Sequence, residues 1–88
     1  MKIKSGYVLR EIVGEYFIIP IGAESIDNNR MITVNETGKT IWETLQKDRS
    51  VDELMKIMLD TYEVDEQILR ADVDEFLAKI RGAGILED

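Results

Sequence analysis

The sequence predicts an α+β fold in which a three-stranded antiparallel sheet packs on a three-helix bundle. β-branched and aromatic stretches separated by turn residues fill the first third of the chain, whereas three apolar stripes with helical spacing fill the rest. The stretch between them, Met31 to Leu45, changes from strand-like to helix-like residues without a linker. A chain of 88 residues can bury one core, so we expect a single domain, with its sheet in residues 1–35 and its helices in residues 36–88.

A hairpin is expected first. Tyr7–Val13 alternates imperfectly between apolar and polar residues, and Glu15–Ile21 is rich in aromatic and β-branched residues. Gly14 between them can supply the positive φ of a tight turn. Because Pro20 has no N–H to donate to a strand ladder, we expect the pairing to end or bulge there.

The third strand and the first helix share the stretch MITVNETGKTIWETL. A polar loop over residues 22–30 precedes Met31–Val34, which we expect to complete a meander ordered one-two-three. Asn35 is a favoured N-cap for a helix over about Glu36–Gln46. One face of this helix carries Gly38, Ile41, Trp42 and Leu45.

Two further helices have sequence signals at their N-termini. Ser50 with Glu53 forms a capping box for the second helix. Asp65 caps the third helix, where Val64 and Leu69 are spaced as a hydrophobic staple. The apolar stripes are Val51, Leu54, Met55, Met58 and Tyr62 in the second helix, and Leu69, Val73, Phe76, Ile80 and Ala83 in the third.

Glycines end the third helix. Gly82 and Gly84 supply its C-terminal stop, because glycine readily adopts the left-handed conformation there. We expect Ile85–Leu86 to fold back onto the core and Glu87–Asp88 to fray.

Composition excludes several kinds of site. The chain has no cysteine and no histidine, so we expect neither a metal nor a cofactor. Carboxylate pairs such as Asp72 and Glu75 are typical of solvated helix surfaces, and we expect no enzyme activity. No apolar run approaches the roughly 18 residues of a membrane span, and the N-terminus does not read as a signal peptide. We therefore expect a soluble cytoplasmic protein without a membrane partner.

The net charge of −7 comes from the helical half. Residues 1–42 carry five basic and five acidic side chains, and residues 43–88 carry six basic against thirteen acidic ones. Nucleic acids are bound by basic faces, so none is expected as a partner, although the three helices alone would also permit a winged-helix DNA-binding protein. A second alternative is a scaffold that forms a homodimer by pairing its third strand with that of a second copy.

One flank of the third helix combines an apolar residue with charges. Leu77 falls at the margin of the apolar stripe, and Arg70, Asp74 and Arg81 lie on the same flank. Each charge alone is typical of a solvated surface, but the set could line a groove for a peptide with apolar and acidic residues.

Three segments resemble a known family. They read VLREIVGEYFIIPIG, MITVNETGKTIWETL and SVDELMKIMLDTYEVDEQILRADVDEFLAKIRGAGIL. Through them the chain resembles the PqqD-like family over almost its whole length, most specifically at ITVNETG and the following Ile-Trp pair. The family is similar to the RiPP recognition element, a winged-helix-like module of three strands and three helices. The segment NETGKTIW resembles the generic branch of this family. The resemblance therefore implies that the precursor peptide is not that of pyrroloquinoline quinone.

The resemblance implies a non-catalytic adaptor. Such modules bind the leader segment of a ribosomally made precursor peptide and deliver it to a tailoring enzyme, often a radical-SAM enzyme. The leader would add beside the third strand, in a cleft closed by the third helix. On this basis Leu77→Asp would weaken leader binding and leave the fold intact. The expected peptide-binding residues are Met31, Ile32, Thr33, Val34, Arg70, Val73, Asp74, Leu77 and Arg81.

Overall fold

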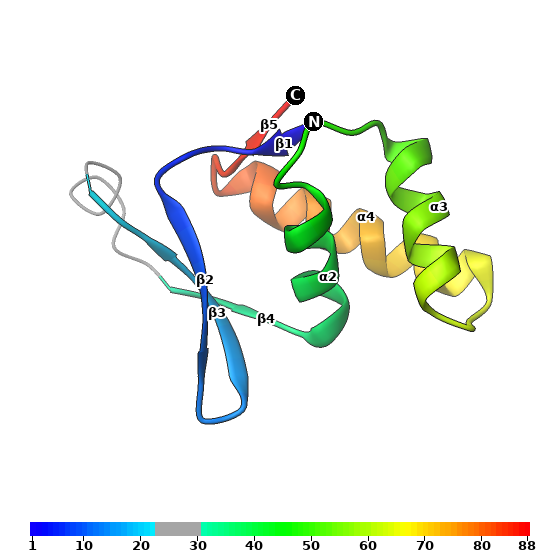
Figure 1. Cartoon of the computed structure of the whole chain (residues 1–88), viewed down its shortest axis with the longest axis horizontal. Coiled ribbons are helices and arrows are strands. Elements are labelled where there is room, and N and C mark those ends of the chain that lie inside the picture. Colours follow the sequence, from blue (N-terminus) through cyan, green and yellow to red (C-terminus); the bar gives the residue numbers. More distant parts are fainter. Residues whose placement is uncertain (23–30) are drawn as a thin grey trace.

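A three-stranded sheet and three helices make up most of the computed structural model, which describes residues 1–22 and 31–88 (Figure 1). This confirms the predicted α+β class and the number of helices over the described residues. The loop predicted for residues 22–30 lies almost entirely outside them. The strands are β1 (Lys2–Ile3), β2 (Tyr7–Ile12), β3 (Glu15–Pro20), β4 (Ile32–Val34) and β5 (Leu86–Glu87), and the helices are α2 (Glu36–Thr44), α3 (Val51–Thr61) and α4 (Glu66–Gly82).

The β2–β3 hairpin turns through two residues with positive φ. Val13 has φ 51° and Gly14 has φ 80°, the pattern of a type I′ turn. The prediction for Gly14 is therefore confirmed, whereas Val13 is unexpected because β-branched residues disfavour this conformation. β3 ends at Pro20, opposite Tyr7, but the Ile21 N–H still donates to the Gly6 carbonyl at 2.8 Å, so the backbone pairing neither bulges nor stops at the proline as expected. Pro20 is tolerated because it lies in a pair whose N–H would point away from β2.

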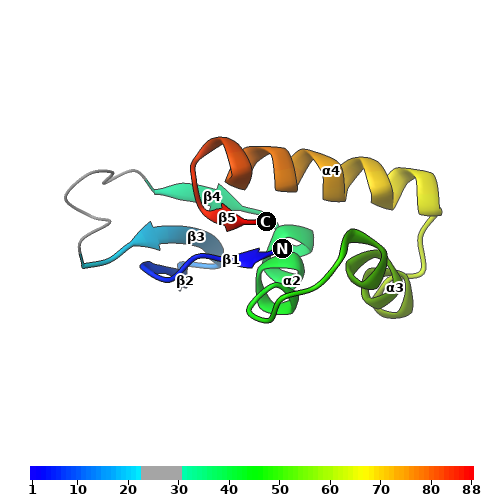
Figure 2. The same ribbon diagram turned by 90° about the horizontal axis from the view of Figure 1, so that it is seen from above.

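The three-stranded sheet has the order β2-β3-β4, so the predicted meander is confirmed. β4 pairs antiparallel with β3 and forms an edge of this sheet. Figure 2 shows α4 along one side of the molecule, with the sheet toward its C-terminal end and α3 toward its N-terminal end.

The helices begin where their caps predict. The side chain of Asn35 accepts a hydrogen bond from the Gly38 N–H at 2.8 Å, and Ser50 with Glu53 forms the complete capping box. Asp65 caps α4 as expected. Val64 leaves 49% of its surface exposed and Leu69 is buried, and the staple between them stays a prediction.

One apolar core joins the sheet to the helices. Its members come from every helix and from four of the strands, and Trp42 is among them at 5% exposure. The residues that the core buries completely are Ile18, Ile41, Leu45, Leu54, Met58, Val73 and Ile80.

The C-terminal segment forms a strand, so the expectation that residues 87 and 88 fray is wrong. β5 pairs antiparallel with β1, with Lys2 opposite Glu87. The Lys4 N–H also donates to the Ile85 carbonyl at 2.8 Å. Asp88 accepts a hydrogen bond from Arg81 at 2.9 Å between Oδ1 and Nη2. These contacts hold the segment against β1 and α4, while Ile85 and Leu86 are buried as expected.

Candidate functional site

The hairpin turn sets which backbone groups of β3 face β4. Ile12 and Glu15 close a two-residue turn, so they form a hydrogen-bonded pair, and every second pair along the ladder repeats this geometry. The bond from the Ile21 N–H to the Gly6 carbonyl at 2.8 Å follows the same alternation. The intervening residues of β3 must therefore turn their backbone groups the other way, toward β4.

Thr33 consequently presents its backbone to the free edge of the sheet. Val34 and Ile32 lie opposite the residues of β3 that turn toward β4, whereas Thr33 lies opposite Phe17, which turns toward β2. In an antiparallel strand the N–H and the C=O of one residue point to the same side. Both backbone groups of Thr33 therefore point away from β3 and can meet a further strand.

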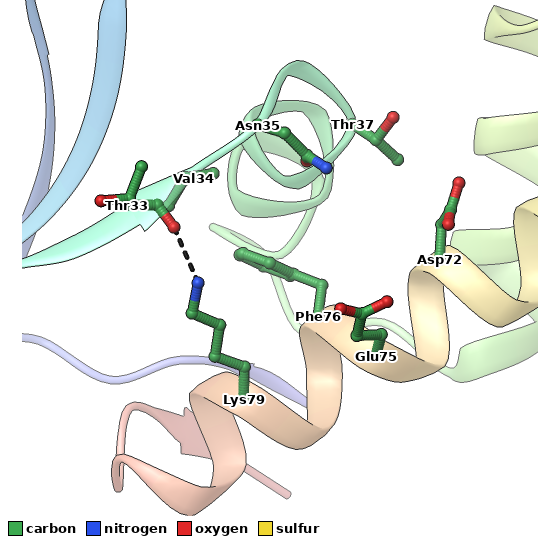
Figure 3. Close-up of a pocket in the computed structure, with 8 residues that line it drawn as sticks. All are labelled: Thr33, Val34, Asn35, Thr37, Asp72, Glu75, Phe76 and Lys79. Atoms are coloured by element: carbon green, nitrogen blue, oxygen red, sulfur yellow. Dashed lines mark hydrogen bonds between the residues drawn. The ribbon is translucent and has the colours of Figure 1, made fainter.

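A cleft of about 300 Å³ lies between this edge and α4 (Figure 3). One wall contains Thr33, Val34 and Asn35, together with Thr37 from the first turn of α2. The other wall is a single flank of α4. The α4 residues that line it are Asp72, Glu75, Phe76 and Lys79.

The base of the cleft is a close packing of three elements. Gly38 of α2 lies against Val34 of β4 and Phe76 of α4, so tightly that an added Cβ would come within 2.7 Å of the Val34 side chain and 2.9 Å of the Phe76 ring. A residue with a side chain would not fit at position 38 without a shift of its neighbours. Because the contact fixes α4 relative to β4, it also sets the position of the two walls.

Charges divide the cleft into two ends. Lys79 lies beside β4, and its Nζ donates a hydrogen bond to the Thr33 carbonyl at 2.8 Å (Figure 3). Asp72 and Glu75 lie farther toward the N-terminus of α4, on the side of Asn35 and Thr37. A ligand would therefore meet a cation at one end of the cleft and carboxylates toward the other.

Lys39 of α2 lies near β3 and has a raised pKa. The Nζ of Lys39 lies 5.0 Å from the centre of the Tyr16 ring. Tyr16, followed by the Glu43 carboxylate, raises the pKa of Lys39 above its ordinary value. Lys39 is therefore cationic over the whole neutral range.

The structure does not bring the predicted residues of α4 to this cleft. The expectation that Leu77 borders an open groove is wrong, because Leu77 is 4% exposed and packs in the core together with Val73, which is fully buried. Arg70 pairs with Asp74 at 3.0 Å between Nε and Oδ1, and Arg81 pairs with Asp88. Neither pair lines the cleft.

The peptide-binding residues predicted on the third strand lie at or beside the cleft, unlike those predicted on α4. Thr33 and Val34 line the cleft, Met31 is 52% exposed just before β4, and Ile32 packs partly against the core. Their role in peptide binding stays a prediction.

Sequence reasoning missed the flank of α4 that faces β4. Asp72, Glu75 and Lys79 repeat at helical spacing and so share a face, which is a signal available in the sequence. However, the spacing shows only that these residues are neighbours. Which flank of the buried stripe faces the strand depends on how α2 and α4 pack, and the α4 pattern does not encode it.

The described part of the chain contains neither a metal-binding cluster nor a helix that could span a membrane. Within residues 1–22 and 31–88, no three His, Cys, Asp or Glu side chains are grouped so that they could hold a metal ion. Over the same residues, no helix combines the length and the apolar character that crossing a membrane requires.

Comparisons with known proteins found a family and a similar structure. The family model described as coenzyme PQQ synthesis protein D (PqqD) matches residues 22–86. A solved structure described as TbiB1 in complex with the TbiA(beta) leader peptide is similar to this chain, with a TM-score of 0.73 and 22% sequence identity. The similarity covers 99% of this chain and 95% of that one, and shows a shared fold. A search of curated proteins found no match.

Proposed function

This chain belongs to the PqqD family, and from that membership we propose that it is a non-catalytic adaptor that binds the leader segment of a ribosomally made precursor peptide and presents it to a modifying enzyme. The similar structure contains TbiB1 with a bound leader peptide, which supports the same role for a chain of this fold. The observation that carries the proposal furthest is the outward backbone of Thr33 beside the cleft.

The leader segment binds by adding a strand to β4. Sheet edges with unpaired backbone groups accept extended peptides, and strand addition is a recurrent mode of peptide recognition. The side chains of such a strand can contact the cleft wall that α4 forms. A few backbone hydrogen bonds contribute only about 0.5–1.5 kcal/mol each, so contacts with α4 must supply most of the selectivity.

The expected peptide-binding residues follow from this geometry. Met31, Thr33 and the start of α2 provide the strand side, whereas the flank of α4 that contains Phe76 and Lys79 replaces the flank expected from sequence. The acidic surplus of residues 43–88 disfavours the alternative of a nucleic-acid-binding protein.

A proline at position 33 tests strand addition directly. Thr33→Pro removes the outward N–H and leaves the β3–β4 bonds of Ile32 and Val34 in place, because proline is tolerated where an edge N–H faces solvent. We expect it to weaken leader binding about two- to tenfold, the equivalent of one lost backbone hydrogen bond. The probes are fluorescein-labelled leader segments of short peptides encoded beside the gene, and the measurement is fluorescence anisotropy.

Thr33→Ala is the matched control, because it changes the same side chain but keeps the backbone N–H. It should bind the labelled leader about as well as the wild type does. If both variants bind equally well, strand addition at β4 is wrong. If the wild-type protein binds none of the leaders, the adaptor role itself is wrong.

A further inference from the structure

Lys79 is hydrogen-bonded to the backbone carbonyl that a peptide strand added to β4 (the guest strand) would use as an acceptor. Its ammonium donates to the Thr33 carbonyl at 2.8 Å, although the two residues are 46 positions apart in the chain. That carbonyl points away from β3, toward the position of a fourth strand. Lysine side chains on an edge are one means by which proteins prevent unwanted strand pairing. A guest strand must therefore take over this carbonyl from Lys79.

Lys79 differs from the two arginines of the same helix. Arg70 and Arg81 are each paired with a carboxylate, Asp74 and Asp88 respectively. Among the ion pairs of the described residues, none involves Lys79. No carboxylate of the described residues therefore neutralises the charge of Lys79. When Lys79 leaves the Thr33 carbonyl, its ammonium group remains inside the cleft that a bound peptide would enter.

From this arrangement, and resting on the proposed function, we propose that Lys79 closes the β4 edge in the free protein and selects an acidic side chain in the bound peptide. A carboxylate on the guest replaces the Thr33 carbonyl as the partner of the ammonium, and charge-assisted hydrogen bonds of this kind are stronger than neutral ones. The guest backbone N–H then bonds to the Thr33 carbonyl that Lys79 has released.

The carboxylates of the cleft fix where the acidic residue lies. Asp72 and Glu75 repel a guest carboxylate from their end of the cleft, so it settles at the end where Lys79 lies. Glu75 is also the intramolecular competitor for the released ammonium, because it lies four residues earlier on the same helix. A guest carboxylate must outcompete Glu75 for the ammonium group, so an acidic residue in the peptide should raise its affinity only moderately.

The same charges determine which side chains the bound peptide can carry at neighbouring positions. Four residues of helix span about 6 Å, and two residues of strand span about the same distance. A guest residue two positions from the acidic one therefore lies near Glu75, where a basic or neutral side chain is accepted and an acidic one is not. The occupant is an extended peptide with an acidic side chain near Thr33 and no second acid two residues away.

Selection from a random peptide library tests this assignment without knowledge of the natural leader. The immobilised full-length protein is offered displayed random dodecapeptides, and the enriched sequences are compared between wild type and Lys79→Glu. Lys56→Glu on α3 is the matched control, since it makes the same change of charge on another exposed helical lysine outside the cleft. We expect the wild type and Lys56→Glu to enrich one acidic position, and Lys79→Glu to enrich a basic residue there.

Binding of one selected peptide then gives the size of the effect. Replacing its acidic residue by alanine should weaken binding to the wild type about two- to fivefold, the range for an exposed ion pair, and should leave binding to Lys79→Met unchanged. Circular dichroism of each variant confirms that it is folded before the comparison.

Each outcome decides the matter. If Lys79→Glu enriches the same acidic peptides as the wild type, the role of Lys79 is wrong and the adaptor role stands. If the wild type enriches no peptide, the proposed function fails, and the role of Lys79 fails with it. If light scattering shows a wild-type dimer that the selected peptide does not dissociate, a second copy occupies the edge and the proposal is likewise overturned.

Discussion

Gly38 lies where α2 packs closely on β4 and α4. A Cβ at this position would lie 2.7 Å from Val34 Cγ1 and 2.9 Å from Phe76 Cε1, distances that ordinary packing does not permit. The absence of a side chain therefore allows α2 to pack closely on Val34 and Phe76, which both line the cleft. Because Phe76 also lines the cleft, a change at Gly38 acts on the fold and on the site together.

Gly38→Ala should lower the free energy of unfolding. Overpacking costs about 1–3 kcal/mol, while replacing a glycine inside a helix recovers up to about 1 kcal/mol, so we expect a net loss of about 1–2 kcal/mol. Urea denaturation followed by far-ultraviolet circular dichroism measures it. Gly82→Ala is the matched control. Gly82 is the last residue of α4 and not in the left-handed conformation expected from sequence, which only Gly84 of the two adopts. A Cβ at position 82 meets nothing within 4 Å, so the change should be neutral or stabilising. Equal stabilities of the two variants would contradict the packing account.

Leu77 shows the limit of helical periodicity at the residue scale. The 100° spacing predicts its place at the margin of the apolar stripe, and the structure buries it to 4% exposure. A residue at the margin is buried or exposed according to what packs beside it, and periodicity does not contain that information.

Leu77→Asp should therefore destabilise the fold, contrary to the expectation from sequence. The substitution removes a buried apolar side chain and places a carboxyl group in the core, at a cost of about 3–5 kcal/mol. Thermal unfolding monitored by circular dichroism checks the loss. Ala78→Asp places the same group on the neighbouring exposed position of α4 and should unfold close to the wild-type temperature. An unchanged midpoint for Leu77→Asp would show that the core tolerates the charge.

At the scale of single elements, local signals locate the helix starts and the hairpin turn. Each described helix begins at the cap that the sequence identifies, because a cap needs only a side chain and an amide two or three residues away. The turn at Gly14 is equally local. The β1–β5 pair was missed because it joins two-residue strands from opposite ends of the chain, which leave no periodic pattern to read.

The capping box of α3 makes the stability of this helix depend on pH. The backbone N–H of Ser50, and then its hydroxyl, bind the Glu53 carboxylate and lower the pKa of Glu53 below its ordinary value of 4.5. A lowered pKa in the folded state contributes stability above the unfolded pKa, and this contribution is lost as the pH falls through the folded pKa. Wild type should therefore melt at a higher temperature than Glu53→Gln at pH 6, with the difference shrinking toward pH 3.

Calorimetry across this pH range measures the difference between the two melting temperatures. Ser50→Ala is the companion variant, because it removes the hydroxyl cap at a cost of about 1 kcal/mol and should lower the melting temperature at pH 3 as well as at pH 6. A constant gap between wild type and Glu53→Gln would show that the carboxylate does not contribute through its charge.

At the scale of the whole molecule, the sequence predicts the sheet order, the helices and the position of the free edge. It does not predict which flank of α4 faces that edge. Both flanks carry charges of either sign, with Arg70, Asp74 and Arg81 on one side and Asp72, Glu75 and Lys79 on the other. The choice follows from the packing of α2 on α4 around Gly38, which is a property of the assembled fold.

The pairing of β1 with β5 bears on where a protein fused to this chain would be attached. Lys2 lies opposite Glu87, so both ends of the described chain leave the molecule from adjacent points (Figure 1). A polypeptide fused to either end would be anchored at nearly the same distance from the β4–α4 cleft. The length of linker needed for a fused domain to reach this cleft is thus nearly the same for N-terminal and C-terminal fusions.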